Sequence, residues 1–390
     1  MKRDNLLDNA EVIIGKEGLL ESIKSGQTLK IKFGVDPTRP DLTFGHLVVF
    51  NKLRQFQDAG HQAILLIGDY TARIGDPSGR SDLRPELSEA EVEKNASTYL
   101  EQAFKVLDKK KTVVRRNSEW FGKMSFGDAL SLTRSMTVAR MLERDDFEKR
   151  YKCNQPISMV EFMYPLIQGY DSIVLESDLE LGGSDQLFNM LVGRNLQKEQ
   201  GSSAQAVLTM PLLVGLDGSR KMSKSYDNYI AFNDSAKDIF GKTMSISDEV
   251  MWDYFRLLLL KEKSEIDTLK KIHPMECKKQ LAKELTSLFY GKDEAQQECD
   301  SFSQVFSKGQ DPDEMPEVSI ASLQSENPTL LHVLSGADLF ESKGQIRRLI
   351  SQGAIKLDGE KVLDPDLEAN KIKENAIIKA GKKIFIRVIP

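Results

Sequence analysis

The stretch that decides the fold is residues 29–50, LKIKFGVDPTRPDLTFGHLVVF. Its first part, Leu29–Val35, is an apolar run of strand length, and the turn signal Asp36-Pro37-Thr38 follows it. Its last part leads into Gly45–Asp58, where apolar residues recur at helical spacing. A strand that passes through a loop into a helix predicts one unit of an α/β sheet, with the helix beginning at Gly45-His46.

The alternation of strand-like and helical stretches continues outward to about Gly218. The further strand candidates are Ala63–Ile67, Thr112–Arg115, Ser172–Glu176 before the string Gly182-Gly183-Ser184-Asp185, and Ala204–Thr209. A helix is expected from that glycine-containing string to about Leu196. Strands that alternate with helices predict a Rossmann-like parallel sheet. The helical stretch Ser118–Gly169 interrupts the alternation and is predicted to be an insertion between two halves of the sheet.

The α/β pattern predicts a first domain over residues 1–230. The sequence after residue 230 indicates two further parts. Residues 231–316 are expected to form an all-helical domain that ends in a polar linker with two prolines, Gln310–Pro316. Residues 329–390 predict a small α+β module. Its expected elements are a helix at Gly344–Gln352, a strand at Ala354–Leu357, a turn at Asp358-Gly359 and a strand at Lys383–Ile389.

Composition excludes several protein classes. The chain has 390 residues, of which 40% are hydrophobic and 29% charged, so it is neither disordered nor collagen-like. No apolar stretch approaches the ~18 residues of a membrane span, and the first residues do not resemble a signal peptide. The three cysteines are widely spaced, which fits a reducing cytoplasm better than a disulfide framework or a zinc site; they are Cys153, Cys277 and Cys299.

Charge is distributed unevenly along the chain. The whole chain carries −5, but residues 329–390 contain eleven Lys and Arg against eight Asp and Glu. This C-terminal stretch therefore carries +3 and leaves −8 for the remainder. Such an asymmetry fits contact with a polyanion, and it fits an ordinary solvated surface equally well.

Two groups of residues have the chemistry of a phosphate site. The helix start at Gly45-His46 presents backbone N–H groups and a partial positive charge, which together attract anions. The imidazole of His46 and the hydroxyls of Thr38 and Thr43 can donate hydrogen bonds to phosphate oxygens there. In the loop Lys221–Ser225, two lysines can clamp a triphosphate and neutralise a departing pyrophosphate. An ordinary turn and a solvated basic loop are the plain alternatives.

These motifs together resemble one family. Thr43-Phe44-Gly45-His46 matches the last two positions of the HIGH signature of class I aminoacyl-tRNA synthetases, and Lys221–Ser225 matches all of KMSKS. Further strings are similar to tyrosyl-tRNA synthetases in particular: Asp36-Pro37-Thr38, Gln55–His61, Ile74–Gly79, Tyr164–Asp171 and Gly182–Gln186. The resemblance covers essentially the whole chain and is closest to the bacterial subgroup with the full KMSKS motif.

The resemblance implies a tyrosine site. Asp76, Tyr164 and Gln168 would accept hydrogen bonds from the substrate ammonium, and Asp171 would accept one from the phenol. Gln186 would lie by the substrate carboxylate. Lys32 stands where many relatives carry a tyrosine that faces the phenol, so it is expected in the same pocket.

The resemblance also implies an ATP site and a two-step reaction. The tyrosine carboxylate would attack the α-phosphorus of ATP to give tyrosyl-adenylate and pyrophosphate, and a terminal ribose hydroxyl of tRNA would then take the tyrosyl group. A carboxylate is already a nucleophile at neutral pH, so positioning and charge stabilisation suffice. Magnesium would accompany ATP, without a protein metal site. The expected ATP-binding residues are Asp36, Gly45, His46, Gly183, Asp185, Lys221, Met222 and Lys224. The expected catalytic residues are His46, Thr43, Thr38, Lys221 and Lys224.

One departure from the family pattern leaves alternatives open. Thr43 replaces the first histidine of HIGH and retains only one donor, so weaker stabilisation of the leaving group is expected. Two alternatives to a tyrosine–tRNA ligase are a paralogue that activates a tyrosine-like acid for another acceptor and a non-catalytic RNA-binding regulator. The intact KMSKS string and the complete amino-acid pocket favour the ligase. The isolated His273 and His332 are expected to be structural.

Macromolecular partners are also implied by the resemblance. The tail resembles an alpha-L type RNA-binding module, in which Lys343, Arg347 and Lys356 would contact tRNA phosphates. The helical residues 235–308 would face the anticodon. Residues 118–169 would supply much of the interface of a homodimer.

Overall fold

The computed structural model describes residues 6–77, 87–307, 315–323, 325, 327–340, 342–381 and 384–389. By their contacts the residues form two compact units, Met1–Gln296 and Gln297–Pro390. Each unit has its own architecture.

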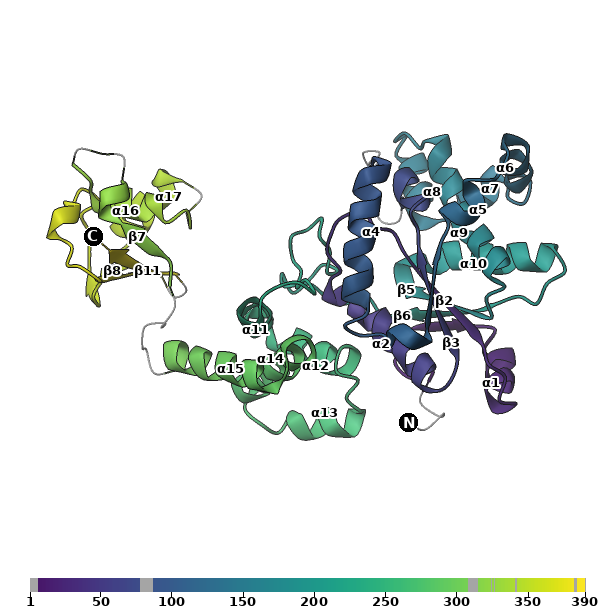
Figure 1. Ribbon diagram of the computed structural model, residues 1–390, viewed down its shortest axis with the longest axis horizontal. Coiled ribbons are helices and arrows are strands. Elements are labelled where there is room, and N and C mark those ends of the chain that lie inside the picture. Colours follow the sequence, from purple (N-terminus) through teal and green to yellow (C-terminus); the bar gives the residue numbers. More distant parts are fainter. Residues whose placement is uncertain are drawn as a thin grey trace. The chain divides into compact units, whose positions relative to one another are not determined.

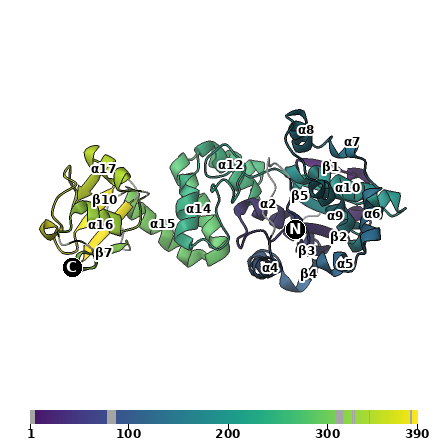
Figure 2. The ribbon, with the colours of Figure 1, turned by 90° about the horizontal axis from the view of Figure 1, so that it is seen from above.

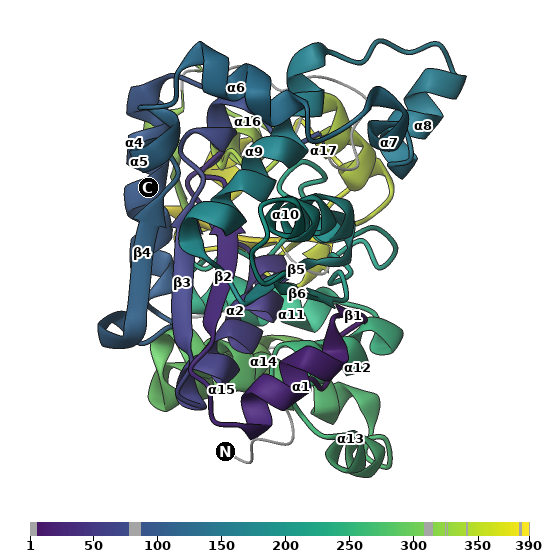
Figure 3. The same ribbon diagram turned by 90° about the vertical axis from the view of Figure 1, so that its right-hand side faces the viewer.

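The first unit is built on a six-stranded sheet with the order β1-β6-β5-β2-β3-β4. The strands are β1 (Val12–Ile14), β2 (Lys30–Val35), β3 (Gln62–Ile67), β4 (Thr112–Arg116), β5 (Leu179–Gly183) and β6 (Ala206–Met210). β2 to β6 pair parallel with one another, and β4, β3 and β2 lie side by side in Figure 3. The Rossmann-like fold class is therefore confirmed. The pattern did not predict that the edge strand β1 pairs antiparallel with β6.

Helices cover both faces of this sheet. The crossover connections place α2 (Phe44–Asp58) and α4 (Glu89–Ala103) on one face, and α9 (Met159–Leu175) and α10 (Leu187–Glu199) on the other (Figure 2). The predicted helix after the first strand is α2. Its residues Leu47, Phe50 and Leu53 are buried at the spacing that the sequence shows.

The sheet order reverses between β2 and β5. From β2 the chain adds β3 and β4 on one side, and from β5 it adds β6 on the other. In an open α/β sheet, ligands bind in the crevice at the carboxyl ends of the strands at such a reversal. The loops that follow Val35 and Gly183 both begin at this point.

The predicted strand at Ser172–Glu176 is wrong. Its first four residues form the last turn of α9, and Glu176 ends that helix with φ at 49°. The strand of this region is β5, which begins at Leu179. A short apolar run does not by itself distinguish a strand from a buried helical turn, and here packing on α10 selects the helix.

The remaining parts of the first unit are helical. The helices of the predicted insertion are α5 (Ser118–Phe121), α6 (Phe126–Thr133), α7 (Val138–Met141), α8 (Asp145–Lys152) and most of α9. Outside it lie α1 (Lys16–Lys24), α3 (Thr71–Ile74), α11 (Ala236–Ser245), α12 (Asp248–Leu257), α13 (Lys263–Leu269) and α14 (Pro274–Tyr290), and α15 (Lys292–Ser307) follows. α11 to α14 share one buried cluster with the sheet, in which Phe44 stacks on Phe289. The boundary at residue 230 stays a prediction.

The second unit is a small α+β module (Figure 1). Its sheet has the order β7-β11-β10-β8-β9, and α16 and α17 share the buried cluster with it. The bounds are β7 (Glu317–Ser319), α16 (Leu330–Gly336), α17 (Lys343–Ser351), β8 (Ile355–Leu357), β9 (Glu360–Lys361), β10 (Ile377–Ala380) and β11 (Ile384–Ile389). Asp358 and Gly359 both have positive φ, as a two-residue hairpin turn requires. The predicted linker falls largely on residues 308–314, outside the described residues.

Candidate active site

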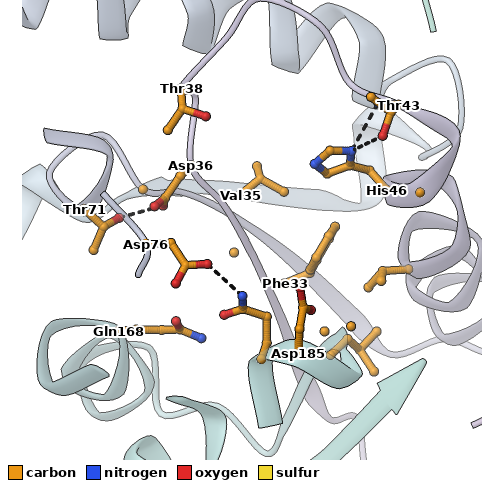
Figure 4. A pocket seen from close by; sticks show the side chains of 18 of the residues that line it. Phe33, Val35, Asp36, Thr38, Thr43, His46, Thr71, Asp76, Gln168 and Asp185 are labelled. Atoms are coloured by element: carbon orange, nitrogen blue, oxygen red, sulfur yellow. Dashed lines mark hydrogen bonds between the residues drawn. The ribbon is translucent and has the colours of Figure 1, made fainter. Parts of the chain in front are cut away.

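One cavity of about 510 Å³ opens at the carboxyl ends of β2 and β5. All predicted tyrosine- and ATP-site residues line it, although the chain separates them widely. These residues are Lys32, Asp36, Thr38, Thr43, Gly45, His46, Asp76, Tyr164, Gln168, Asp171, Gly183, Asp185, Gln186, Lys221, Met222 and Lys224. Figure 4 shows several of them converging from the loop after β2, from α9 and from the turn after β5.

The start of α2 fixes the state of His46. The backbone N–H of Thr43 donates to His46 Nδ1 at 3.1 Å, and the Thr43 hydroxyl lies 2.9 Å from the same atom. Because Nδ1 accepts from a backbone N–H, the ring proton must sit on Nε2. Burial, together with nearby Lys224, lowers the pKa of His46 to about 3. His46 is therefore a neutral imidazole with an Nε2–H donor at a helix N-terminus.

This arrangement also accounts for Thr43. Thr43 is the N-cap of α2, and its side chain and that of His46 form a reciprocal capping box. Since Nδ1 carries no proton, the Thr43 hydroxyl donates to it. The hydroxyl proton that the sequence suggested for phosphate is thus used on His46.

The KMSKS lysines are both held by groups at the rim of the cavity. Lys221 Nζ lies 2.7 Å from Asp185 Oδ2. Lys224 Nζ donates to the Asp41 carbonyl at 2.6 Å and to the Tyr99 hydroxyl at 2.8 Å. The loop therefore lines the same cavity as the helix start that carries His46.

Acceptor groups gather in the part of the cavity away from His46 (Figure 4). Tyr164 donates its hydroxyl proton to Asp36 Oδ2 at 2.8 Å, which directs a hydroxyl lone pair elsewhere. Gln186 donates to Asp76 Oδ2 at 2.8 Å (Figure 4), and its own amide oxygen accepts from Asn189 at 3.0 Å. Asp76 and Tyr164 can thus both offer oxygen atoms to a cation bound between them.

Asp171 occupies a buried position at the other end of the cavity. Trp120 Nε1 donates to its carboxyl group at 3.0 Å, and Asn117 Nδ2 lies at 3.5 Å. Burial raises the pKa of Asp171 to about 8, despite the opposing charge of Lys32. The carboxyl group is therefore largely protonated at neutral pH in the free protein.

Several groups that shape the cavity were not predicted. Thr71 donates to Asp36 at 2.7 Å, and a Cβ added to Gly68 would lie only 2.0 Å from the Asp36 carboxylate. Asn117 and Trp120 hold Asp171, yet neither belongs to a motif. Glu180 could have been found, because a carboxylate within the apolar strand LELGG requires a partner.

The three predicted tRNA-binding residues belong to the second unit. Lys343 and Arg347 are exposed on α17, four residues apart, and Lys356 is exposed on β8. Lys356 lies opposite Lys361 on one neighbouring strand and opposite Lys379 on the other. Lys361, Lys356 and Lys379 therefore form a row of lysines across the sheet.

Comparison with known proteins gives consistent results. Residues 24–307 match the family of class I tRNA synthetases (W and Y), and residues 308–388 match a tyrosine–tRNA ligase SYY-like C-terminal domain. The tyrosine–tRNA ligase of Oleidesulfovibrio alaskensis is 48% identical over 98% of this chain and 97% of its own. That of Thermotoga maritima is 49% identical over 97% and 95%.

Solved structures show the same fold. Tyrosyl-tRNA synthetase from Archaeoglobus fulgidus, complexed with L-tyrosine, superimposes with a TM-score of 0.63. The match covers 76% of this chain and 98% of that one, at 24% identity. The family resemblance read from the sequence is confirmed by the two family models and the two ligases above, and the solved structure adds the shared fold.

Proposed function

Because the chain belongs to the tyrosine–tRNA ligases of the class I tRNA synthetase family, we propose that its cavity activates tyrosine with ATP and transfers it to tRNA. One observation carries this proposal. A single cavity holds oxygen acceptors and a buried carboxyl group at one end, and a helix N-terminus with two lysines at the other. The first end suits a phenolic amino acid, and the second suits a triphosphate.

The tyrosine end is assigned as follows. Asp76, Tyr164 and Gln168 accept hydrogen bonds from the substrate ammonium, since the Tyr164 proton is directed to Asp36. Asp171 accepts the phenol hydrogen bond, and Trp120 holds its carboxyl group in place. A phenylalanine side chain would leave this buried acceptor without its partner, which disfavours phenylalanine.

The phosphate end acts by positioning and charge. The Nε2–H of His46 and the backbone N–H groups at the start of α2 donate to phosphate oxygens as charge develops on them. Thr43 positions the imidazole, and Thr38 lines the same region of the cavity. Lys221 and Lys224 stabilise the departing pyrophosphate after they exchange their present partners for phosphate oxygens.

The chemical groups that line the cavity indicate which residues would bind the adenosine and how magnesium would enter. Gly183 and Asp185 hold the ribose: a Cβ at Gly183 would lie 2.8 Å from Asp185 Oδ1, so glycine leaves this carboxylate in its present position. Gly45, Asp36 and Met222 complete the ATP site, and Gln186 faces the substrate carboxylate. Magnesium enters with ATP as part of the substrate. Among the described residues, no cluster of three or more His, Cys, Asp or Glu side chains could hold a metal.

The direct test is amino-acid-dependent exchange of pyrophosphate into ATP without tRNA. We expect exchange with tyrosine and none with phenylalanine or tryptophan at the same concentration. Equal exchange with phenylalanine would contradict the assigned phenol site. A folded protein that exchanges with no amino acid would support the non-catalytic RNA-binding alternative.

The lysine row of the second unit supports tRNA binding. Like charges opposite each other across neighbouring strands destabilise a sheet, so a row of three favours a polyanionic ligand. We expect Lys356→Gln to weaken tRNA binding and to lower the slope of log affinity against log salt by about 1. Exchange without tRNA should not change. Lys371→Gln, in the same module but paired with Glu368 at 3.2 Å, is the control. Unchanged tRNA affinity for Lys356→Gln would remove this residue from the interface.

Exposed apolar side chains of the helical insertion support a homodimer. Phe126 on α6, Val138 on α7 and Met159 on α9 are 79%, 57% and 74% exposed. Exposed apolar side chains of this size are favourable to bury in a protein interface. We expect twice the chain mass by light scattering for the wild type, and the mass of one chain for Val138→Asp. Leu363→Asp, which changes an exposed apolar residue of the other unit, should leave the mass unchanged. A monomeric wild type at micromolar concentration would contradict the proposal.

We place the protein in the cytoplasm. Within the described part of the chain, no disulfide joins Cys153, Cys277 or Cys299, as is usual in a reducing compartment. No described helix combines the length and apolar character of a membrane span.

A further inference from the structure

A buried ion pair joins two strands at the floor of the cavity. Lys32 on β2 and Glu180 on β5 are partners in the strand register, and Nζ lies 2.9 Å from Oε1. Their side chains are only 1% and 2% exposed. Burial removes most of the hydration of both charges, so the pair is stable only if the protein satisfies the remaining hydrogen-bonding groups.

The ammonium of Lys32 uses all of its donors within the protein. An ammonium has three N–H groups. Those of Lys32 reach Glu180 Oε1 at 2.9 Å, Ser172 Oγ at 2.7 Å and the backbone oxygen of Gln168 at 3.2 Å. No N–H remains for a ligand. Lys32 lies in the expected pocket, but in this geometry it has no donor left for a substrate phenol.

The carboxylate of Glu180 determines how the Gln168 side chain lies. Gln168 Nε2 donates to Glu180 Oε1 at 3.2 Å, and the other carboxylate oxygen accepts from Ser172 at 3.1 Å and from Gln205 at 2.6 Å. An amide presents NH₂ on one side and oxygen on the other. Because the NH₂ group is directed to Glu180, the oxygen lies on the side of Asp76 (Figure 4). An ammonium needs an oxygen acceptor, and the reversed amide would oppose it with a donor.

We propose that Lys32 and Glu180 are positioning residues that hold the Gln168 amide oxygen toward the substrate ammonium, and that neither contacts the phenol. This inference rests on the proposed function and assigns the pair to one end of the substrate. Glu180 supplies the acceptor that orients the amide. Lys32 neutralises Glu180 and binds the Gln168 backbone, so it fixes this turn of α9 against β2 and β5.

The test uses a neutral double variant, Lys32→Met with Glu180→Gln. A single substitution would leave one charge buried without its partner and would destabilise the fold. In the double variant, the amide introduced at position 180 can offer an NH₂ group to Gln168, so the Gln168 amide is free to reverse. Lys30→Met is the matched control, because Lys30 lies on the same strand and forms an ion pair with Glu176 in an exposed position. Thermal unfolding and the KM for ATP show that each variant is folded.

Three competitors of tyrosine in the exchange assay separate the two ends of the substrate. Tyramine carries ammonium and phenol, phenethylamine carries only ammonium, and 3-(4-hydroxyphenyl)propionate carries phenol without ammonium. In the double variant, we expect inhibition by tyramine and phenethylamine to be roughly 10- to 100-fold weaker than in the wild type. Inhibition by the propionate should weaken by less than about twofold. If inhibition by tyramine and the propionate weakens while inhibition by phenethylamine stays unchanged, the inference is overturned in favour of a phenol contact. Unchanged inhibition by all three would overturn it in favour of a purely structural pair. Exchange by the wild type with tyrosine tests the function separately.

Discussion

The His46→Ala variant should lower kcat for tyrosine-dependent exchange by roughly 100- to 1000-fold, with a much smaller effect on the KM for tyrosine. The Nε2–H donor at the start of α2 acts on charge that develops only during phosphoryl transfer, so its loss affects the transition state more than the ground state. Steady-state exchange kinetics measure both constants. His273→Ala is the control, because His273 caps α14 and does not line the cavity.

The pH profile tests the charge assigned to His46. With its pKa lowered to about 3 by burial, the imidazole stays neutral from about pH 6 to 8 and contributes no inflection there. Thr43→Val should lower kcat by about tenfold at most, since the backbone N–H of Thr43 still fixes the tautomer. An inflection near pH 6.5 that disappears in His46→Ala would contradict the assignment of a neutral donor.

The HIGH-like string shows what the sequence could and could not reveal. It identified the residues at the helix start, since the strand-turn-helix order is a local property. It suggested that Thr43 acts on phosphate, which stays a prediction, and it did not show that the Thr43 hydroxyl also contacts His46. The second unit contains the same arrangement: Thr329 and His332 form a capping box at the start of α16. Thr-x-x-His is thus a helix-capping pattern in this chain, and only the cavity makes one copy functional.

Long-range partners account for most of what the sequence missed. Asp171 was expected to bind the phenol, but its partners Trp120 and Asn117 lie about 50 residues away and belong to no motif. The strand pattern predicted β2, β3 and β6, because buried parallel strands are apolar runs, and it also predicted the less buried edge strand β4. It misplaced the strand near Ser172, where the apolar run belongs to α9. The charges of Lys32 and Glu180 within apolar strands were the one available sign of a buried network.

Relative to the wild type, the Asp171→Asn variant should become increasingly stable as the pH rises. The same substitution should impair recognition of tyrosine. Burial raises the pKa of Asp171 from 3.8 to about 8, so the folded state keeps a proton that the unfolded state releases near pH 4. Between about pH 4 and 8 the folded state binds more protons, and the free energy of unfolding of the wild type therefore falls as the pH increases. The stabilisation is complete below about pH 4 and is lost as the pH passes through 8.

Asparagine does not ionise, so the free energy of unfolding of the variant does not fall with pH for this reason. Each pH unit within the window corresponds to about 1.4 kcal/mol, and the variant should gain on the order of 5 kcal/mol over the wild type by about pH 9. Urea unfolding at about pH 5, 7 and 9 measures this difference, and Asp267→Asn, an exposed carboxyl group, should show none of it. Exchange assays should show the preference for tyrosine over phenylalanine reduced by roughly 10- to 100-fold, because the introduced amide can turn its NH₂ group, which accepts no hydrogen bond, toward the phenol. A difference in stability that is the same at all three pH values would mean that Asp171 is already ionised in the folded protein. The residue that selects the phenol is thus expected to be one that lowers the stability of the fold as the pH rises, because its carboxyl group is buried where it can form a selective hydrogen bond.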